Sequence, residues 1–132
     1  SALQLRLTDD NGAHWRAPRS LRLAPGTVIS KPDIAYSPQG DVAVMWLAVA
    51  RDGSYTAWAA VMRRGTEQFS RPLRISRSPS PPRSRIAQRG NNWDGDDLSS
   101  VAVDGQAVHV VWADGRAGFL GSWYARIPLS QF

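Results

Sequence analysis

The sequence feature that most constrains the fold is a turn near the N-terminus, residues 8–15, which read TDDNGAHW. These residues fit the pattern S/T-x-D-x-G-x-x-W at every constrained position. The side chain of Asp10 can accept hydrogen bonds from backbone N–H groups of its own turn, and Gly12 supplies the positive φ that closes the turn. Trp15 is expected to fold back over the hairpin as an apolar plug. The pattern therefore predicts a tight structural turn between two strands.

An internal repeat indicates that the chain contains more than one copy of a similar unit. Residues 34–46 match residues 101–112, because each segment has an aliphatic strand, a turn and a second strand that ends in tryptophan. Each tryptophan is followed by another aromatic residue, Trp58 in the first copy and Tyr124 in the second. Residues 62–69, where a second copy of the turn is expected, lack both the Asp and the Gly. That copy of the turn is degenerate.

Composition and patterning predict an all-β protein. The chain has 11 Gly and 9 Pro, and its apolar runs are short, alternating and bounded by turn residues. No long stretch keeps helical periodicity. The expected strands are 2–8, 18–23, 33–37, 41–48, 55–62, 72–76, 99–103, 107–112 and 121–128.

The composition also argues against several kinds of site. The chain has no cysteine, which excludes disulfides and thiolate metal sites. His14 lies in the turn and His109 in an expected strand, which argues against a histidine metal site. We therefore expect no metal and no cofactor. The longest apolar run, residues 42–50, is too short to span a bilayer, so no membrane partner is expected. No signal peptide is visible, and the excess of arginine over lysine is typical of a GC-rich bacterial genome.

Three segments together resemble the sialidase-like β-propellers that carry Asp-box (BNR) repeats. The first is the turn at residues 8–15, which fits the Asp box, and the second is the W-x-x-P-x-x-L segment that follows it. The third is residues 95–116, where Gly-Asp precedes two strands and then W-x-D-x-R. The resemblance covers nearly the whole chain. It lies in the repeated pattern of turns and strands and not in one family's active-site signature. It implies a six-bladed propeller with four antiparallel strands in each blade, and an extracellular or periplasmic location.

The resemblance divides the chain into one propeller segment of about two blades. Residues 1–23 would end one blade, residues 33–76 would form a full blade, residues 77–98 a long solvated loop, and residues 99–128 most of a further blade. Two blades cannot close a ring, and open blade edges favour aggregation. Either further blades lie outside this chain, or several copies close a ring as a homo-oligomer, with the first two strands completing a neighbour's last blade. We favour the first arrangement.

The resemblance places the ligand face opposite the Asp-box turn, on the loops that carry much of the charge. Loop carboxylates facing an arginine could supply acid and base for glycoside hydrolysis, and arginine forks suit a substrate carboxylate. A plainer alternative is that Asp96 and Asp97 cap a strand while Asp114 pairs with Arg116. The candidate catalytic residues are Asp94, Asp96, Asp97 and Asp114, and the candidate substrate-binding residues are Arg51, Arg89, Arg116, Trp93 and Tyr55.

A complete sialidase site is not expected on these residues. Enzymes of that kind use a Tyr nucleophile activated by a Glu, and the only Glu is Glu67, in the degenerate turn on the far side. The basic tract 71–89 and the net charge of +5 raise the question of nucleic acid, but no aromatic residues interleave with its arginines. We therefore expect carbohydrate or a glycoconjugate as the ligand, as part of a glycoside hydrolase-like domain. The alternative is a non-catalytic scaffold or lectin-like module.

Overall fold

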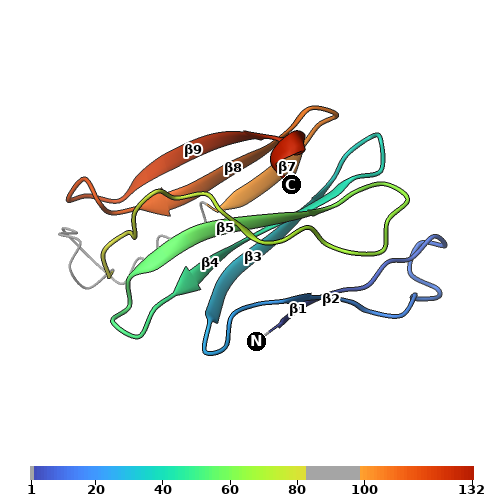
Figure 1. The fold of residues 1–132 in the computed structure, drawn as a ribbon, viewed down its shortest axis with the longest axis horizontal. Helices are drawn as coiled ribbons and strands as arrows, with labels where there is room; N and C mark the ends of the chain where they lie inside the picture. Colours follow the sequence, from blue (N-terminus) through green and yellow to red (C-terminus); the bar gives the residue numbers. More distant parts are fainter. Residues whose placement is uncertain (1, 83–98) are drawn as a thin grey trace.

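The computed structural model describes residues 2–82 and 99–132, and within these ranges it confirms the all-β prediction (Figure 1). Nine strands are present, with no α-helix among the described residues and a short 3-10 helix at Leu129–Gln131. Each strand overlaps one of the ranges expected from the sequence. The strands are β1 (Ala2–Leu5), β2 (Arg19–Arg22), β3 (Val28–Tyr36), β4 (Val42–Val49), β5 (Tyr55–Met62), β6 (Leu73–Arg74), β7 (Ser100–Val103), β8 (Ala107–Asp114) and β9 (Gly121–Pro128).

The strands pair into three antiparallel sheets with two, four and three members. The first sheet contains β1 and β2, the second runs β3-β4-β5-β6, and the third runs β7-β8-β9. Within each sheet the strands that are adjacent in the sequence pair with one another, and the chain passes to a new sheet after β2 and after β6. This grouping matches the strands that the sequence analysis assigned to each unit, while the interpretation of the sheets as propeller blades stays a prediction.

Strand β3 starts earlier than the sequence predicts, at Val28 instead of residue 33. The register of its pairing with β4 shifts between Ser30 and Asp33, which is a β-bulge. Within the bulge Lys31 has a φ of 48°, and Pro32 has no N–H to donate to the ladder. The strand therefore continues across a proline that, in the sequence, reads as a strand boundary.

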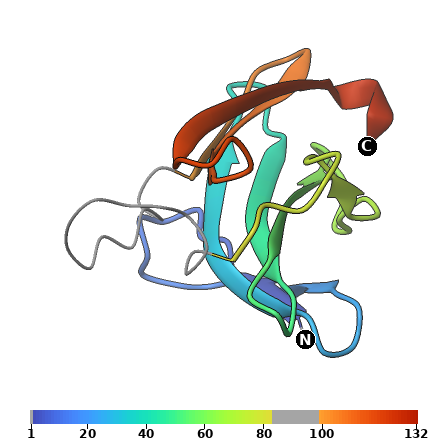
Figure 2. The ribbon, with the colours of Figure 1, turned by 90° about the vertical axis from the view of Figure 1, so that its left-hand side faces the viewer.

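The third sheet packs over one face of the second (Figure 2). A continuous apolar core fills the space between them, including Met45 and Leu47 from β4 and Val108 and Val110 from β8, all buried. Trp112 points into the same core. Burial of this apolar surface is the main stabilising term between the two sheets.

The opposite face of the second sheet packs on the smaller first sheet. Here Val44, Trp46 and Ala60 are buried against Leu21 of β2. Trp46 therefore faces the preceding sheet, as Trp112 does one repeat later. The two tryptophans, which occupy matching positions in the sequence repeat, point the same way in their sheets.

The aromatic residues that follow these tryptophans need one correction. Trp46 pairs across the sheet with Trp58, but Trp112 pairs with Trp123. The β8–β9 hairpin is one residue shorter than the β4–β5 hairpin, so Trp123, and not Tyr124, matches Trp58. Tyr124 consequently points to the other face of the third sheet.

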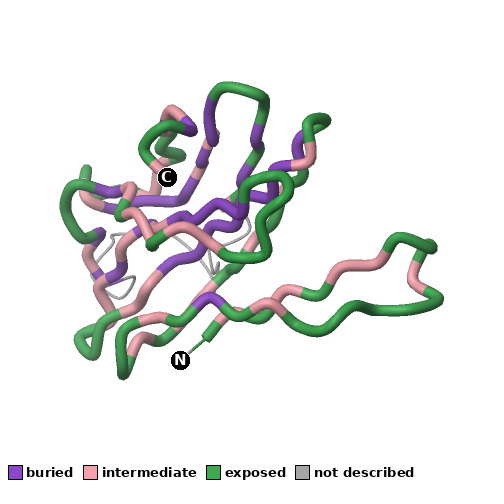
Figure 3. Tube along the Cα trace, turned by 45° about the vertical axis from the view of Figure 1, so that its right-hand side comes forward, coloured by how far each residue is buried: buried purple, intermediate pink, exposed green. Residues whose placement is uncertain are grey.

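The Asp-box turn has the bonding expected of it. The Oδ1 atom of Asp10 accepts hydrogen bonds from the Thr8 hydroxyl (2.7 Å) and the His14 N–H (2.9 Å), and the Gly12 N–H donates to Thr8 Oγ1 (3.0 Å). Gly12 has a φ of 93°. The prediction that Trp15 is an apolar plug is wrong, because this residue is 56% exposed. The turn projects from the body of the molecule (Figure 3), so its tryptophan covers the glycine without reaching a core.

Candidate functional site

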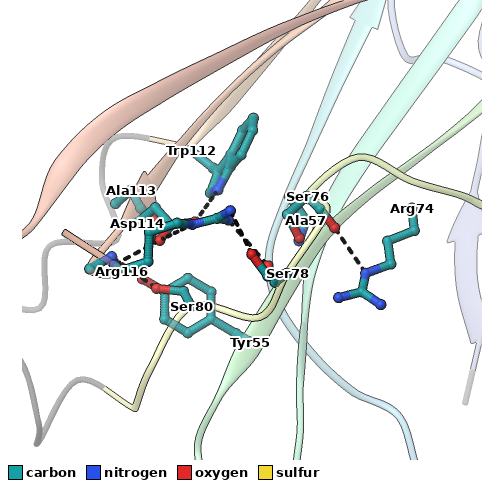
Figure 4. A network of polar contacts seen from close by, with 11 residues as sticks. Tyr55, Ala57, Arg74, Ser76, Ser78, Ser80, Trp112, Ala113, Asp114 and Arg116 are labelled. Atoms are coloured by element: carbon teal, nitrogen blue, oxygen red, sulfur yellow. Dashed lines mark hydrogen bonds and ion pairs between the residues drawn. The ribbon is translucent and has the colours of Figure 1, made fainter.

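Asp114, a candidate catalytic residue at the end of β8, lies in a closed polar cluster (Figure 4). Asp114 has no exposed surface, and its oxygens accept hydrogen bonds from the Trp112 indole N–H (3.0 Å) and from the Arg116 backbone N–H (3.0 Å). The Arg116 guanidinium donates to both carboxylate oxygens, at 3.0 and 2.5 Å. Burial alone would raise the pKa of Asp114, but these hydrogen bonds outweigh it and hold the pKa below its usual value.

The guanidinium of Arg116 is almost fully engaged by the protein itself. In addition to Asp114, it donates from Nη1 to the Ser78 hydroxyl (2.9 Å) and from Nη2 to the Ser78 carbonyl (3.1 Å). Its centre lies 4.5 Å from the centre of the Trp123 ring. A guanidinium has five N–H donors, so about one remains. The bidentate fork that would bind a substrate carboxylate is therefore occupied.

The cluster joins the second sheet to the third. The Tyr55 hydroxyl, on β5, donates to the Ala113 carbonyl (3.0 Å), and the Gly115 N–H donates to the Ser80 hydroxyl (2.9 Å). Ser80 also exchanges backbone hydrogen bonds with Tyr55 and is buried. The beginning of the segment expected as a solvated loop is therefore an ordered connector. The residues of this Asp114 cluster are Tyr55, Ser78, Ser80, Trp112, Asp114 and Arg116.

The predicted site residues fall into three groups in the structure. Asp114, Arg116 and Tyr55 meet in the cluster just described. Arg51 lies on the exposed β4–β5 hairpin and takes no part in it. The remaining candidates lie outside the described residues; they are Arg89, Trp93, Asp94, Asp96 and Asp97. The contacts of the described members correspond to the plainer alternative, an Asp114–Arg116 pair within one loop.

Sequence reasoning missed a groove on the opposite side of the molecule. It has a volume of about 550 Å³ and lies between the Asp-box turn and residues 62–67. Two exposed aromatic residues line it, Trp15 and Tyr36, which is 69% exposed. Trp15 was expected to be an apolar plug of the turn, and Tyr36 lies within the expected strand 33–37, so neither was among the candidate binding residues. In the sequence only Trp15 stands beside an arginine, Arg16, and Tyr36 carries no comparable signal.

The groove carries a surplus of positive charge. Arg6 and Arg64 line it, and neither guanidinium pairs with a carboxylate among the described residues. Other arginines of the groove are neutralised, as Arg19 is by Glu67 at 2.5 Å. The aliphatic stem of Arg64 packs near Gly40 and the Tyr36 hydroxyl.

The chain matches no family model, no curated protein and no solved structure. The resemblance to sialidase-like propellers therefore stays a prediction. In the part of the chain that the structure describes, no helix is long and apolar enough to cross a membrane. No group of three or more His, Asp or Glu side chains in that part is arranged to hold a metal ion.

Proposed function

We propose that this chain is a segment of a sialidase-like Asp-box β-propeller that recognises carbohydrate without catalysing its hydrolysis. Three sheets packed in series, with matching tryptophans Trp46 and Trp112 facing the preceding sheet, support the propeller interpretation. The bonding of the Asp-box turn supports it as well. A scaffold alone does not define a ligand, so the functional part of the proposal depends on the sites.

The strand directions favour further strands over closure by identical copies. Strand β1 runs toward the Asp-box turn, which lines one groove together with the turn that follows β5. Strand β9 ends on that same side, because Leu129 just after it accepts a hydrogen bond from Arg63. In a ring of identically oriented copies β1 would therefore run parallel to a neighbour's β9, whereas every pair in these sheets is antiparallel. Additional strands running opposite to β1 would complete the first sheet.

One observation carries the non-catalytic part of the proposal. Asp114 is the one predicted catalytic carboxylate within the described residues, and it is buried and bonded to Arg116 and Trp112. A general acid must keep a proton near neutral pH, and a general base must reach its substrate. An ionised carboxylate closed off by a salt bridge does neither. Asp114 therefore serves to join the sheets.

The groove beside the Asp-box turn supplies the binding surface. Exposed aromatic rings, here Trp15 and Tyr36, stack on the apolar faces of sugar rings, and free guanidinium groups bind carboxylates or sulfates. Its volume lies in the range of sites for small ligands. Arg6 and Arg64 favour an anionic sugar over a neutral one. The ligand that this surface fits best is an acidic oligosaccharide.

Calorimetric titration with sialyllactose and with lactose tests the proposal. We expect sialyllactose to bind more tightly, and Arg64→Gln to weaken binding by about tenfold, as loss of one charge-assisted hydrogen bond predicts. Arg51→Gln is the matched control, because Arg51 lies on the face that the resemblance selects. Loss of binding in Arg51→Gln but not in Arg64→Gln would move the site to that face. Equal affinity for the two sugars, or hydrolysis of a fluorogenic sialoside, would contradict the proposal.

A further inference from the structure

The outer face of the third sheet carries a chain of three polar side chains that the proposed function does not use. The Nδ1 atom of His109, on β8, lies 2.8 Å from the Tyr124 hydroxyl on β9. The other ring nitrogen, Nε2, lies 3.0 Å from Oδ2 of Asp104, in the β7–β8 turn. The imidazole and phenol rings stack, with centroids 6.1 Å apart. Asp104, His109 and Tyr124 thus form one continuous hydrogen-bonded chain, here called the Tyr124 triad.

The direction of the hydrogen bonds in the triad follows from the carboxylate. Oδ1 of Asp104 accepts hydrogen bonds from the backbone N–H groups of Gln106 (2.7 Å) and Ala107 (2.8 Å), which fix its position. These bonds and the one with His109 lower the pKa of Asp104 to about 2, so it is ionised at neutral pH. A carboxylate only accepts, so Nε2 of a neutral His109 carries the proton. Nδ1 is then an acceptor, and the Tyr124 hydroxyl donates to it.

The matching positions of the second sheet show that this arrangement is not required for the fold. The pair His109 and Arg126 corresponds to Ala43 and Val61, and Tyr124 corresponds to Ala59. In the second sheet these positions are apolar and buried beneath the third sheet. In the third sheet the same face is polar, and Tyr124 is 60% exposed. The two sheets therefore differ at these positions, because the second sheet presents an apolar packing surface and the third a polar one.

We infer that the Tyr124 triad is a nucleophilic site, in which the phenol oxygen of Tyr124 attacks electrophilic acyl or sulfonyl centres that carry a leaving group. A nucleophile bonded to a base that a third group orients is the arrangement that activates hydroxyl nucleophiles. The Tyr124 oxygen forms the new bond while its proton passes to Nδ1 of His109. The leaving group departs with its electron pair, and the imidazolium then returns the proton to the leaving group or to water. Asp104 is a positioning residue, because it holds the ring in the accepting tautomer.

The chain provides its own reference groups for a test. It has three tyrosines. Tyr36 is more exposed than Tyr124, at 69%, and bonds to neither histidine, whereas Tyr55 is buried in the Asp114 cluster. Accessibility alone would make Tyr36 the most reactive of the three. Base assistance by His109 would make it Tyr124.

The probe is benzenesulfonyl fluoride at neutral pH, with the modified tyrosine identified by mass spectrometry of peptides. We expect Tyr124 to react about tenfold or more faster than Tyr36, a modest share of what general-base assistance can contribute. His109→Gln should bring the rate at Tyr124 down to that at Tyr36 or lower. The rate at Tyr36 in the same sample reports whether the variant has kept its fold. Equal rates at the two tyrosines in the unmodified protein, or an unchanged ratio in His109→Gln, would overturn the inference.

The positioning role of Asp104 has a spectroscopic test. The ¹⁵N chemical shifts of an imidazole distinguish the Nε2–H tautomer from the Nδ1–H tautomer. We expect the Nε2–H form for His109 and a mixture of tautomers in Asp104→Asn, with slower modification of Tyr124. The imidazole of His14 serves as an internal control and should not change. A His109 ring in the Nδ1–H form in the unmodified protein would contradict the assignment, because Nδ1 could not then accept the phenol proton.

Discussion

Asp33 and Val101 join the two large sheets through a partly buried hydrogen bond. A carboxylate oxygen of Asp33, on β3, accepts a hydrogen bond from the backbone N–H of Val101, on β7, at 2.9 Å. The Ser100 hydroxyl donates to the same oxygen at 2.9 Å. β7 is the first strand of its sheet, so the side chain of Asp33 supplies an acceptor to an N–H group outside the β7–β8 ladder.

Asp33→Ala should destabilise the fold. It leaves the partly buried Val101 N–H without its acceptor, and an unsatisfied group of this kind costs about 1–3 kcal/mol. Chemical denaturation followed by tryptophan fluorescence measures the free energy of unfolding. Asp33→Asn is the matched control, because its side-chain amide keeps an acceptor oxygen for the Val101 N–H. A free energy unchanged in Asp33→Ala would show that the Asp33–Val101 bond contributes nothing to the joint between the sheets.

Arg116→Ala should be among the most destabilising substitutions in the chain. It removes the partner of the buried Asp114 carboxylate, and breaking a buried ion pair on one side costs about 3–5 kcal/mol. Arg116→Lys should restore only part of this loss, because a single ammonium group cannot bond to Asp114 and Ser78 as the guanidinium fork does. Arg51→Ala serves as the surface control in the same denaturation measurement. Equal stability of Arg116→Ala and Arg51→Ala would mean that the Asp114 cluster does not join the sheets.

The Asp-box turn should open only in strong acid. The backbone N–H of His14, followed by the Thr8 hydroxyl and the His14 ring, lowers the pKa of Asp10 from 3.8 to about 2. A lowered pKa means that the ionised form is favoured in the folded turn. This contribution is therefore fully present above about pH 4 and is lost as the pH falls toward 2. The amide resonance of His14 in NMR spectra should titrate near pH 2, and a midpoint near 3.8 would contradict the bonding described for Asp10.

Gly12→Ala should weaken the Asp-box turn. At a φ of 93° a side chain is strained, and the cost is about 1–2 kcal/mol, although the Trp15 ring leaves room for a methyl group. Gly121→Ala is the matched control, because Gly121 has a negative or extended φ and ordinary contacts around an added Cβ. Hydrogen exchange of the backbone amides at positions 12 and 14, measured in each protein, reports local opening of the turn. Equal protection of the turn in both variants would show that the positive φ is not needed.

The strands were predictable because their pattern is local. β1 shows alternation of apolar and polar residues, β4 and β8 are apolar runs, and glycine or proline marks the turns. Each of these signals depends on residues close in the sequence. The early start of β3 was not predictable, since Lys31 and Pro32 read as a break while the bulge lets the strand continue. The match between Trp58 and Tyr124 failed because a hairpin shorter by one residue shifts every side chain to the other face.

The site was less predictable because its contacts are long-range. The sequence placed Asp114 and Arg116 in one loop and left their pairing open. It gave no sign of Ser78 and Ser80, which read as solvated loop but are brought to the cluster by backbone pairing with Tyr55. The exposure of Trp15 was also missed, because a motif specifies the turn and not what lies above it.

The most direct test of the central claim is an NMR titration of the ¹⁵N-labelled protein with sialyllactose. We predict shifts of the Trp15 indole N–H and of the Arg64 and Tyr36 amides, with little change at Arg51 and in the Asp114 cluster. Shifts confined to Arg51 and the other loops of the opposite face, or no shifts at millimolar sugar, would contradict the assignment of carbohydrate recognition to the groove beside the Asp-box turn.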